Sequence, residues 1–377
     1  MRKSLLALVA AGLLTTATLT GCDDGGDTGD TGSDSARTSN GGSETISGDV
    51  GIGVILPDTK SSARWSTSDP TFLQAAFEKA NVKAEIVNAE GDKEEFKKLA
   101  DTLLDKGAKV LVIANLDAAS GKAVIQDARS RNVPVIDYDR LTLNGGADYY
   151  VSFDNERVGF LQATELKKCL DAKNVANPVV ASLNGSPTDN NAFLFKEGYD
   201  GVLNQMFNDG QLQKGPDQFV AEWDNDTGRE IFSLMLKQYP NLDGVLAAND
   251  GLGNAAIEVL REKKLNGKVQ VTGQDATVEG LQNILAGDQC MTVFKDVKLE
   301  ADAAAELAVA LFQGKKPPAL DKLKDPESGA YVPFKKLEPK AITINNIKTV
   351  VDAKFVDVNT LCNAKFKRAC KTAGVID

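Results

Sequence analysis

From residue 49 onward, short apolar runs alternate with amphipathic stretches along the chain. Seven of these runs are rich in Val, Ile or Ala and stop at Asn, Asp or Gly, which predicts buried β-strands. They are VGIGVIL at residues 50–56, AEIVNA at 84–89, KVLVIANL at 109–116, PVIDYD at 134–139, NPVVASLNG at 177–185, DGVLAAND at 243–250 and KVQVTGQD at 268–275. Because strands and helices alternate at this spacing, we expect parallel sheets covered by helices on both faces. About eleven strand-like runs in all exceed what one doubly wound sheet usually carries, so we expect two similar α/β lobes with a ligand cleft between them.

Local signals predict where two of the helices begin. Asp69 is expected to cap a helix that has Pro70 at its first position. Asp92 and Glu95 have the spacing of a capping box, and the apolar stripe that follows them ends at Gly107. Both stretches are therefore predicted to be helices that cover a sheet.

The composition excludes several function classes. The chain contains no histidine, which removes imidazole metal ligands and every Ser–His or Cys–His nucleophile pair. Its formal net charge of -10 argues against a nucleic-acid surface, because phosphate contacts need clustered Lys and Arg. We therefore expect no cofactor, no metal and no nucleic-acid partner, and a neutral small molecule as the ligand.

The N-terminus is typical of an exported protein. Residues 1–21 begin with Arg2 and Lys3 and continue with an apolar stretch too short for a membrane span, which indicates a signal peptide. The segment LTGC at residues 19–22 resembles the lipobox of bacterial lipoproteins, which implies a lipid on Cys22; the alternative is an ordinary cleavable signal. Residues 22–48 are rich in Gly, Ser, Thr and Asp and predict a disordered tether. We expect a domain that is lipid-anchored to the outer face of the cell membrane.

Four cysteines remain after Cys22. Disulfides are permitted outside the cell, and Cys362 and Cys370 are close enough in sequence to pair within a C-terminal turn. We expect that pair and leave Cys169 and Cys290 open.

Polar side chains recur where the predicted strands end. They include Arg64 and Trp65, Asp139 and Arg140, Asp154 and Asn155, the segment 184–191, Asn249 and Asp250, Gln274 and Asp275, and Lys295. Asp and Asn at such places are also ordinary helix caps, which is the simpler interpretation of Asp154 and Asp250 taken singly. Together, however, so many rigid polar groups match the vicinal hydroxyls of a sugar.

Aromatic rings and paired charges would complete a sugar site. Trp65, and as a second candidate Trp223, offer apolar faces for the C–H side of a sugar ring. Asp139 and Arg140 are expected to compensate each other's charge, because an isolated buried charge is costly. Lys295 is expected to compensate the negative charge of Asp275 or Asp189 on the other lobe.

Seven segments in order carry a family resemblance. They are SSARW, VIDYDRL, YYVSFDNERVG, NGSPTDNNAFLF, AANDG, VTGQDATVEGL and MTVFKD. They resemble the corresponding segments of bacterial D-xylose-binding proteins, the sugar receptors of ABC importers in the ribose/galactose-type periplasmic binding family. The resemblance implies ligand-binding roles for Arg64, Trp65, Asp139, Arg140, Asp189, Asn191, Asn249, Asp275 and Lys295. A second aromatic of that family falls in AEWDNDTGREIF, at Trp223 or, in a shifted register, at the position of Thr227.

The resemblance also implies the domain organisation. Two Rossmann-like lobes, joined by a three-segment hinge, would comprise residues 49–154 with 296–326 and residues 155–295 with 327–352, followed by a C-terminal extension at 353–377. A monomer of this kind would bind one monosaccharide, D-xylose or a related aldose, and dock on an ABC transporter permease. A sensor kinase or chemoreceptor is the alternative partner. A DNA-binding repressor would lack the export signal, and a glycosidase that used Asp139 and Asp275 would need an elevated carboxyl pKa, which the neighbouring Arg140 and Lys295 oppose.

Overall fold

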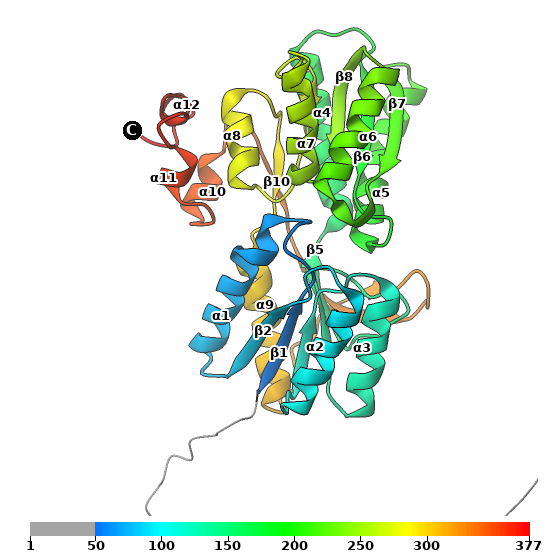
Figure 1. The fold of residues 1–377 in the computed structure, drawn as a ribbon, viewed down its shortest axis with the longest axis vertical. Helices are drawn as coiled ribbons and strands as arrows, with labels where there is room; N and C mark the ends of the chain where they lie inside the picture. The colour runs from blue at the N-terminus through cyan, green and yellow to red at the C-terminus, as the bar shows by residue number, and fades with distance from the viewer. Residues whose placement is uncertain (1–49) are drawn as a thin grey trace, which may run out of the picture. The chain divides into compact units, whose positions relative to one another are not determined.

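The computed structural model describes residues 50–377, which belong to one compact unit. Two lobes within this unit are each built on a separate β-sheet (Figure 1). The N-terminal lobe contains β1 (Ile52–Leu56), the short 3-10 helix η1 (Ala63–Ser66), α1 (Ser68–Lys79), β2 (Ala84–Asn88), α2 (Lys93–Asp105), β3 (Val110–Ile113), α3 (Ala118–Ser130), β4 (Val135–Tyr138), β5 (Tyr149–Phe153), α9 (Val297–Phe312), β11 (Asp321–Lys324) and β12 (Tyr331–Leu337). No helix of the described residues is long and apolar enough to cross a membrane.

The sheet of the N-terminal lobe has the strand order β11-β12-β5-β4-β3-β1-β2. All neighbours are parallel except β11 and β12. Alternate residues of β1 face opposite layers: Ile52 and Val54 pack with α1 and α9, whereas Ile55 packs with Phe96 and Leu103 of α2. β1 and β3 are therefore buried on both faces, as predicted, whereas β2 at the sheet edge is only half-buried.

The C-terminal lobe is built on a four-stranded parallel sheet in the order β7-β6-β8-β9. It contains α4 (Asn155–Ala172), β6 (Val179–Asn184), α5 (Asn190–Asn208), β7 (Gln213–Phe219), η2 (Ala221–Trp223), α6 (Asn225–Gln238), β8 (Leu242–Ala247), α7 (Asp250–Glu262), β9 (Gln270–Val271), α8 (Val278–Ala286), β10 (Thr292–Phe294), β13 (Lys340–Ile342), α10 (Lys348–Asp352), α11 (Val358–Leu361) and α12 (Lys367–Thr372). One large apolar cluster joins the sheet to its helices. The predicted architecture of two parallel-sheet lobes is confirmed.

Three segments connect the lobes: β5 to α4, β10 to α9, and β12 to β13. The first and third are tied together, since the backbone N–H of Asp154 donates to the carbonyl of Leu337 at 2.8 Å. The expected boundary after residue 326 is wrong, because β12 pairs in parallel with β5 and so belongs to the N-terminal lobe. A strand that adds to an existing sheet edge carries no sequence signal of the sheet that it joins.

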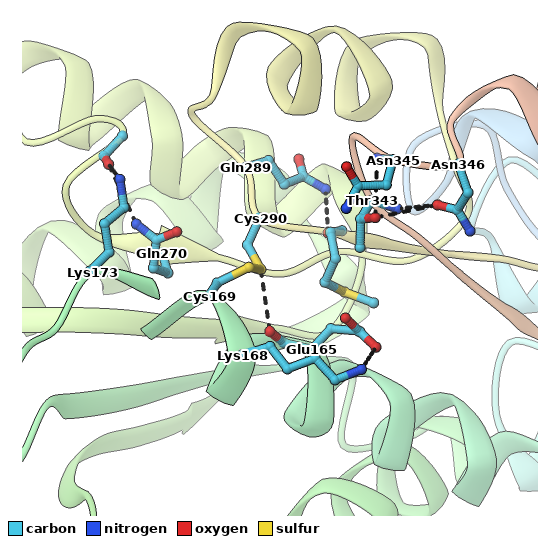
Figure 2. Close-up of a disulfide and its surroundings, with 12 residues drawn as sticks. Glu165, Lys168, Cys169, Lys173, Gln270, Gln289, Cys290, Thr343, Asn345 and Asn346 are labelled. Atoms are coloured by element: carbon cyan, nitrogen blue, oxygen red, sulfur yellow. Dashed lines mark hydrogen bonds and ion pairs between the residues drawn. A yellow bond between two sulfur atoms is a disulfide. The ribbon is translucent and has the colours of Figure 1, made fainter. Parts of the chain in front are cut away.

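Both pairs of described cysteines form disulfides, Cys169 with Cys290 and Cys362 with Cys370. Figure 2 shows the first, which links the last part of α4 to the segment just before β10. The bond therefore ties the C-terminal end of α4 to the segment that leads into β10, both within the C-terminal lobe.

The C-terminal extension is part of the C-terminal lobe rather than an appendage. Leu361 and Phe366 pack in one apolar cluster with Leu281 and Ile284 of α8. The side chain of Gln282 adds a hydrogen bond of 3.1 Å to the carbonyl of Thr360. The extension is thus fixed against α8 by burial and by polar contacts.

One of the two predicted helix caps is correct. Asp92 caps α2, accepting hydrogen bonds from the backbone N–H groups of Glu94 and Glu95 at 2.8 and 3.0 Å. The prediction for Asp69 is wrong: α1 begins at Ser68, two residues before the predicted first position Pro70. Asp69 is fully buried and bonds to Arg64 instead, because a buried guanidinium competes for the carboxylate.

Helices α4 and α5 approach closely through glycines. A Cβ placed on Gly159 would lie 1.9 Å from the carbonyl oxygen of Phe195, and one on Gly198 would lie 2.0 Å from that of Glu156. The helices can pack at this separation only where a side chain is absent. Since α5 begins beside the cleft, this packing sets the position of the residues at its N-terminus.

We expect Gly159→Ala to lower the free energy of unfolding by roughly 1–3 kcal/mol, because the methyl group forces the two helices apart. Gly201→Ala on α5 is the matched control, since nothing lies within 4 Å of the added atom. That variant should be neutral or more stable by up to about 1 kcal/mol. Urea unfolding of both variants measures the difference, and equal effects would contradict the close-packing argument.

Candidate functional site

A small hollow of about 30 Å³ lies between the two lobes at the carboxyl ends of their strands. Every residue that the motifs implied as ligand-binding, together with Trp223, contributes to its wall. The complete wall is Ser61, Ser62, Arg64, Trp65, Asp139, Arg140, Asp189, Asn191, Phe195, Trp223, Asn249, Gln274, Asp275 and Lys295. Strand ends that are scattered along the chain are thus brought together at the place where open α/β sheets bind ligands.

Both carboxylate oxygens of Asp139 have polar partners in the hollow. Its carboxylate contacts Arg64 Nη1 at 2.7 Å and Lys295 Nζ at 3.2 Å through Oδ2, and it accepts from Asn191 Nδ2 at 3.1 Å through Oδ1. Burial by itself raises the pKa of Asp139, but Lys295, Arg64 and Arg140 outweigh burial and hold that pKa well below its usual range. Asp139 is therefore a permanent acceptor and not a proton donor.

The backbone at Asp139 adopts the left-handed region, with φ of 63°. Three donors hold its carbonyl in this conformation: Tyr150 Oη at 2.9 Å, Ser152 Oγ at 2.8 Å and Asn191 Nδ2 at 2.9 Å. Asp tolerates this region better than most residues do. The turn at the end of β4 therefore points the carboxylate into the hollow.

Arg64 is surrounded by three carboxylates. Its guanidinium bonds to Asp69 through Nε and Nη2 at 2.7 and 2.6 Å, to Asp139 at 2.7 Å, and to Glu300 at 2.5 Å. The indole of Trp65 lies 4.3 Å beneath it. Four of the five N–H donors of Arg64 thus bond to protein carboxylates, so this side chain fixes Asp139 and the indole.

Glu300, at the start of α9, is the weakest acid of this cluster. Burial raises its pKa to about 8, and the negative charge of Asp139 adds to that effect, although Arg64 opposes it. Three carboxylates around one guanidinium exceed the positive charge nearby, so a neutral Glu300 lowers the cost of burial.

Arg140 does not pair with Asp139, contrary to the expectation. Its Nε lies 3.1 Å from Asp189 Oδ2, and its Nη1 donates to the carbonyl of Asn115 at 3.1 Å. Consecutive residues at the end of a strand project in different directions, so neighbours in sequence are poor partners. The pair that forms instead joins the two lobes.

Lys295 pairs with Asp275, one of its two predicted partners, but its shorter contact is with Asp139. It lies in the connection between β10 and α9 and contacts Asp139 at 3.2 Å, with Asp275 at 3.8 Å. Its expected pairing with Asp275 is therefore the weaker of its two contacts, and the alternative partner Asp189 is taken by Arg140.

Trp223, rather than Thr227, lines the hollow. Its indole Nε1 donates to Asp189 Oδ2 at 3.1 Å. A Cβ on Gly185 would lie 2.0 Å from the indole, so only glycine at that position lets the ring approach the end of β6. Thr227 lies in the first turn of α6, where its backbone N–H bonds to Asp224.

Two hydrogen bonds close the lobes directly over the hollow. Asn249 Nδ2 donates to the carbonyl of Ser61 at 3.1 Å, and Ser62 Oγ donates to Asp275 Oδ2 at 2.7 Å. Asn249 also caps α7 through its other side-chain atom. The described conformation is closed, and a ring that enters must displace some of these contacts.

The sequence did not single out Ser61, Ser62 and Phe195 as site residues, and it noted Gln274 only as a polar residue at a strand end. Phe195 carries a usable signal, because it follows Asn191 by four residues and so shares its helix face. The serines adjoin Arg64 but have no motif of their own.

Neither Asp154 nor Asp250 lines the hollow. Only Asp154 is the helix cap that the simpler interpretation predicts, because Asn249 caps α7 and Asp250 is the first residue of that helix. Asp154 caps α4. Asp250 accepts from Thr277, Gln289 and Thr292, and burial raises its pKa to about 7. It fixes the loop that carries Asp275, so it supports the site from behind.

The site is suited to binding and not to catalysis. Ionised Asp139 cannot serve as the general acid of a glycosidase. Within residues 50–377, no group of three or more Cys, Asp or Glu side chains is arranged to hold a metal ion. What the wall offers is a dense set of fixed donors, acceptors and aromatic faces.

Comparison with known proteins identifies the class. A family model described as a periplasmic binding protein domain matches residues 52–316. The chain therefore belongs to the periplasmic binding protein family, whose fold and relatives are those of solute-binding proteins and not of enzymes.

Particular relatives narrow the class to sugar receptors. The chain is 34% identical over 304 residues to a D-xylose-binding periplasmic protein of Escherichia coli, covering 80% of this chain and 89% of that protein. It is 33% identical to a multiple sugar-binding periplasmic receptor of Rhizobium radiobacter, covering 80% and 88%. A carbohydrate transporter solute-binding protein of Chloroflexus aurantiacus, solved with D-glucose, superposes with a TM-score of 0.74 at 28% identity, covering 83% of this chain and 98% of that one.

The raised pKa of Glu300 predicts a pH dependence of stability. Between its ordinary pKa of 4.5 and its folded value of about 8, the folded state binds more protons than the unfolded state, so the free energy of unfolding falls as pH rises. Glu300→Gln should remove up to about 1.4 kcal/mol per pH unit of that slope. Urea unfolding between pH 5 and 8 measures it. Glu306→Gln, exposed on the same helix, should keep the full slope, and an unchanged slope in Glu300→Gln would contradict the assignment.

Proposed function

We propose that the chain binds one aldose between its lobes, with D-xylose as the preferred ligand, and delivers it to the permease of an ABC transporter. The observation that carries the proposal is the hollow itself, where three acidic and three basic side chains surround a space flanked by two indoles. These side chains are Asp139, Asp189, Asp275, Arg64, Arg140 and Lys295. Charges arranged in this way compensate one another while presenting oriented bonds to hydroxyl groups.

The relatives favour a pentose, because two of them are named for D-xylose. The relative named for multiple sugars and the neighbour that contains D-glucose support a broader aldose receptor as the alternative.

Ligand binding would act by shifting the lobes toward the closed state. Asp139 and Arg64 belong to the N-terminal lobe, whereas Asp189 and Asn249 belong to the C-terminal lobe. A sugar that bonds to both sets gains its full contacts only when the lobes meet, so it stabilises the closed form. A permease, or alternatively a membrane sensor, would read that form.

We further propose that a lipid on Cys22 holds the domain at the outer face of the membrane. Cys22, the signal peptide and the tether lie outside the described residues. The LTGC segment and the polar stretch after it support the proposal.

The chain has two tryptophans, and both line the hollow, so intrinsic fluorescence reports directly on ligand binding. We expect D-xylose to change the emission and to raise the unfolding temperature of the purified chain, and the gain in unfolding free energy should grow with the logarithm of the sugar concentration over Kd. At a hundredfold excess over Kd the gain is about 2.7 kcal/mol. A response to several pentoses and hexoses would indicate the broader receptor, and no response to any of them would refute sugar binding.

Asp139→Asn tests the site with the same assay. The variant keeps the shape but removes the charge that Arg64 and Lys295 require, so affinity should fall by at least roughly 30-fold. Asp302→Asn, exposed on α9, should bind as the unmodified chain does. An unchanged affinity of Asp139→Asn for the sugar would contradict the central role of this carboxylate in binding.

Replacement of the proposed lipidation site tests the anchor. Cys22→Ser should shift the exported protein from the membrane fraction to the soluble fraction or the medium, because no thiol remains to carry the lipid. Fractionation followed by immunoblotting measures the distribution. Cys362→Ser, which removes a cysteine of the folded domain, should stay with the membrane; continued membrane attachment of Cys22→Ser would contradict lipidation.

A further inference from the structure

A second, larger cavity of about 550 Å³ opens at the mouth of the cleft. It shares Ser61, Ser62, Arg64 and Asp275 with the inner hollow, so the two spaces are separated only by side chains. The hydrogen bond from Ser62 Oγ to Asp275 Oδ2, 2.7 Å long, forms part of that partition. The mouth cavity has the size of a typical small-molecule site, whereas the hollow holds little more than the volume of a few waters.

Both lobes and the C-terminal extension build this mouth cavity. The N-terminal lobe contributes the segment 59–64 with Thr67 and Ser68, the C-terminal lobe contributes Asn225, Gly251, Asn254 and the segment 275–279, and the extension contributes Phe355, Val356, Asp357 and Thr360. Phe355 packs on Phe294 at a ring-centroid distance of 5.0 Å, and Phe294 directly precedes Lys295 of the hollow. The extension is therefore fixed to the same connection that carries a site residue.

The chemistry of the mouth cavity resembles that of the hollow. Its wall combines amides, hydroxyls, carboxylates and one aromatic ring. Two of its side-chain oxygens, Asn225 Oδ1 and Asp275 Oδ1, are buried and have no hydrogen-bond donor within the described part of the chain. Buried acceptors of this kind are costly unless a donor reaches them, and sugar hydroxyls are donors.

A smaller cavity of about 180 Å³ opens elsewhere beside the hollow, next to Arg140, Asp189 and Trp223. Its wall is dominated by charged side chains, among them Asp58, Glu90 and Lys93. A neutral sugar unit is matched less well there, because it cannot replace the hydration of so many charges.

We propose that the mouth cavity is a second sugar subsite, so that the protein takes a disaccharide with one unit in the hollow and the next unit against the extension. This inference rests on the proposed function, since the first unit occupies the aldose site. In the bound state, hydroxyl groups of the ligand replace the Ser62 to Asp275 bond, which uncovers the Asp275 carboxylate as an acceptor.

Calorimetry with the purified chain tests the proposal with defined probes: D-xylose with xylobiose, and D-glucose with cellobiose. For whichever monosaccharide binds, the matching β-1,4-linked disaccharide should bind with a Kd within tenfold of it or tighter. A disaccharide that binds more than a hundredfold more weakly would overturn the subsite while leaving the proposed function intact. Failure of every monosaccharide and disaccharide to bind would overturn the proposed function, and the subsite with it.

Variants separate the subsite from the hollow. Asn225→Ala should weaken disaccharide binding by about tenfold and leave the monosaccharide unchanged, because Asn225 lines only the mouth cavity. Phe355→Leu, which keeps an apolar side chain against Phe294, should likewise affect only the disaccharide. Asn359→Ala, exposed on the extension and outside the cavity wall, is the control and should change neither. Equal losses for both ligands in Asn225→Ala would overturn the assignment.

Discussion

The buried contact of Asp139 with Arg64 and Lys295 is the interaction on which the rest of the site depends. These three charges come from the end of β4, from the segment after β1 and from the connection between β10 and α9. Charges removed from water must find partners of opposite sign, so the three segments have to converge if any of the charges is to be buried. Asn191 of the C-terminal lobe also donates hydrogen bonds to Asp139, so the buried carboxylate has a partner on the far side of the cleft as well.

Several residues combine a structural role with a place at the hollow. Asp189 caps α5 and contacts both Arg140 and Trp223, and Asn249 caps α7 while bonding to the N-terminal lobe. Because one oxygen of each side chain is held by a helix N-terminus, the remaining polar atoms point in a fixed direction. Rigid placement of this kind lowers the entropy that ligand binding would otherwise cost.

Much of the fold and the membership of the site were predictable from sequence, whereas the pairing within the site was not. The strand-end clusters around Asp139, Asn249 and Lys295 were predicted because parallel strands bring their carboxyl ends to one edge. The predicted partner of Arg140 was wrong because charge compensation was sought at the neighbouring residue, and the predicted cap at Asp69 was wrong because a buried guanidinium binds that carboxylate. Which of several nearby carboxylates pairs with a given arginine depends on the direction and burial of the side chains, and local sequence does not specify either.

The sequence by itself determined that the chain forms two α/β lobes with polar residues at their facing strand ends, because apolar periodicity and strand-end composition are local properties. Only the tertiary structure decided that β12 joins the first sheet, that Cys169 pairs with Cys290, and that the extension borders the cleft. Each of these depends on segments far apart in sequence that compete for one sheet edge, one thiol or one apolar surface. Three-dimensional packing decides which segment wins, and the order of residues along the chain does not show how distant segments pack.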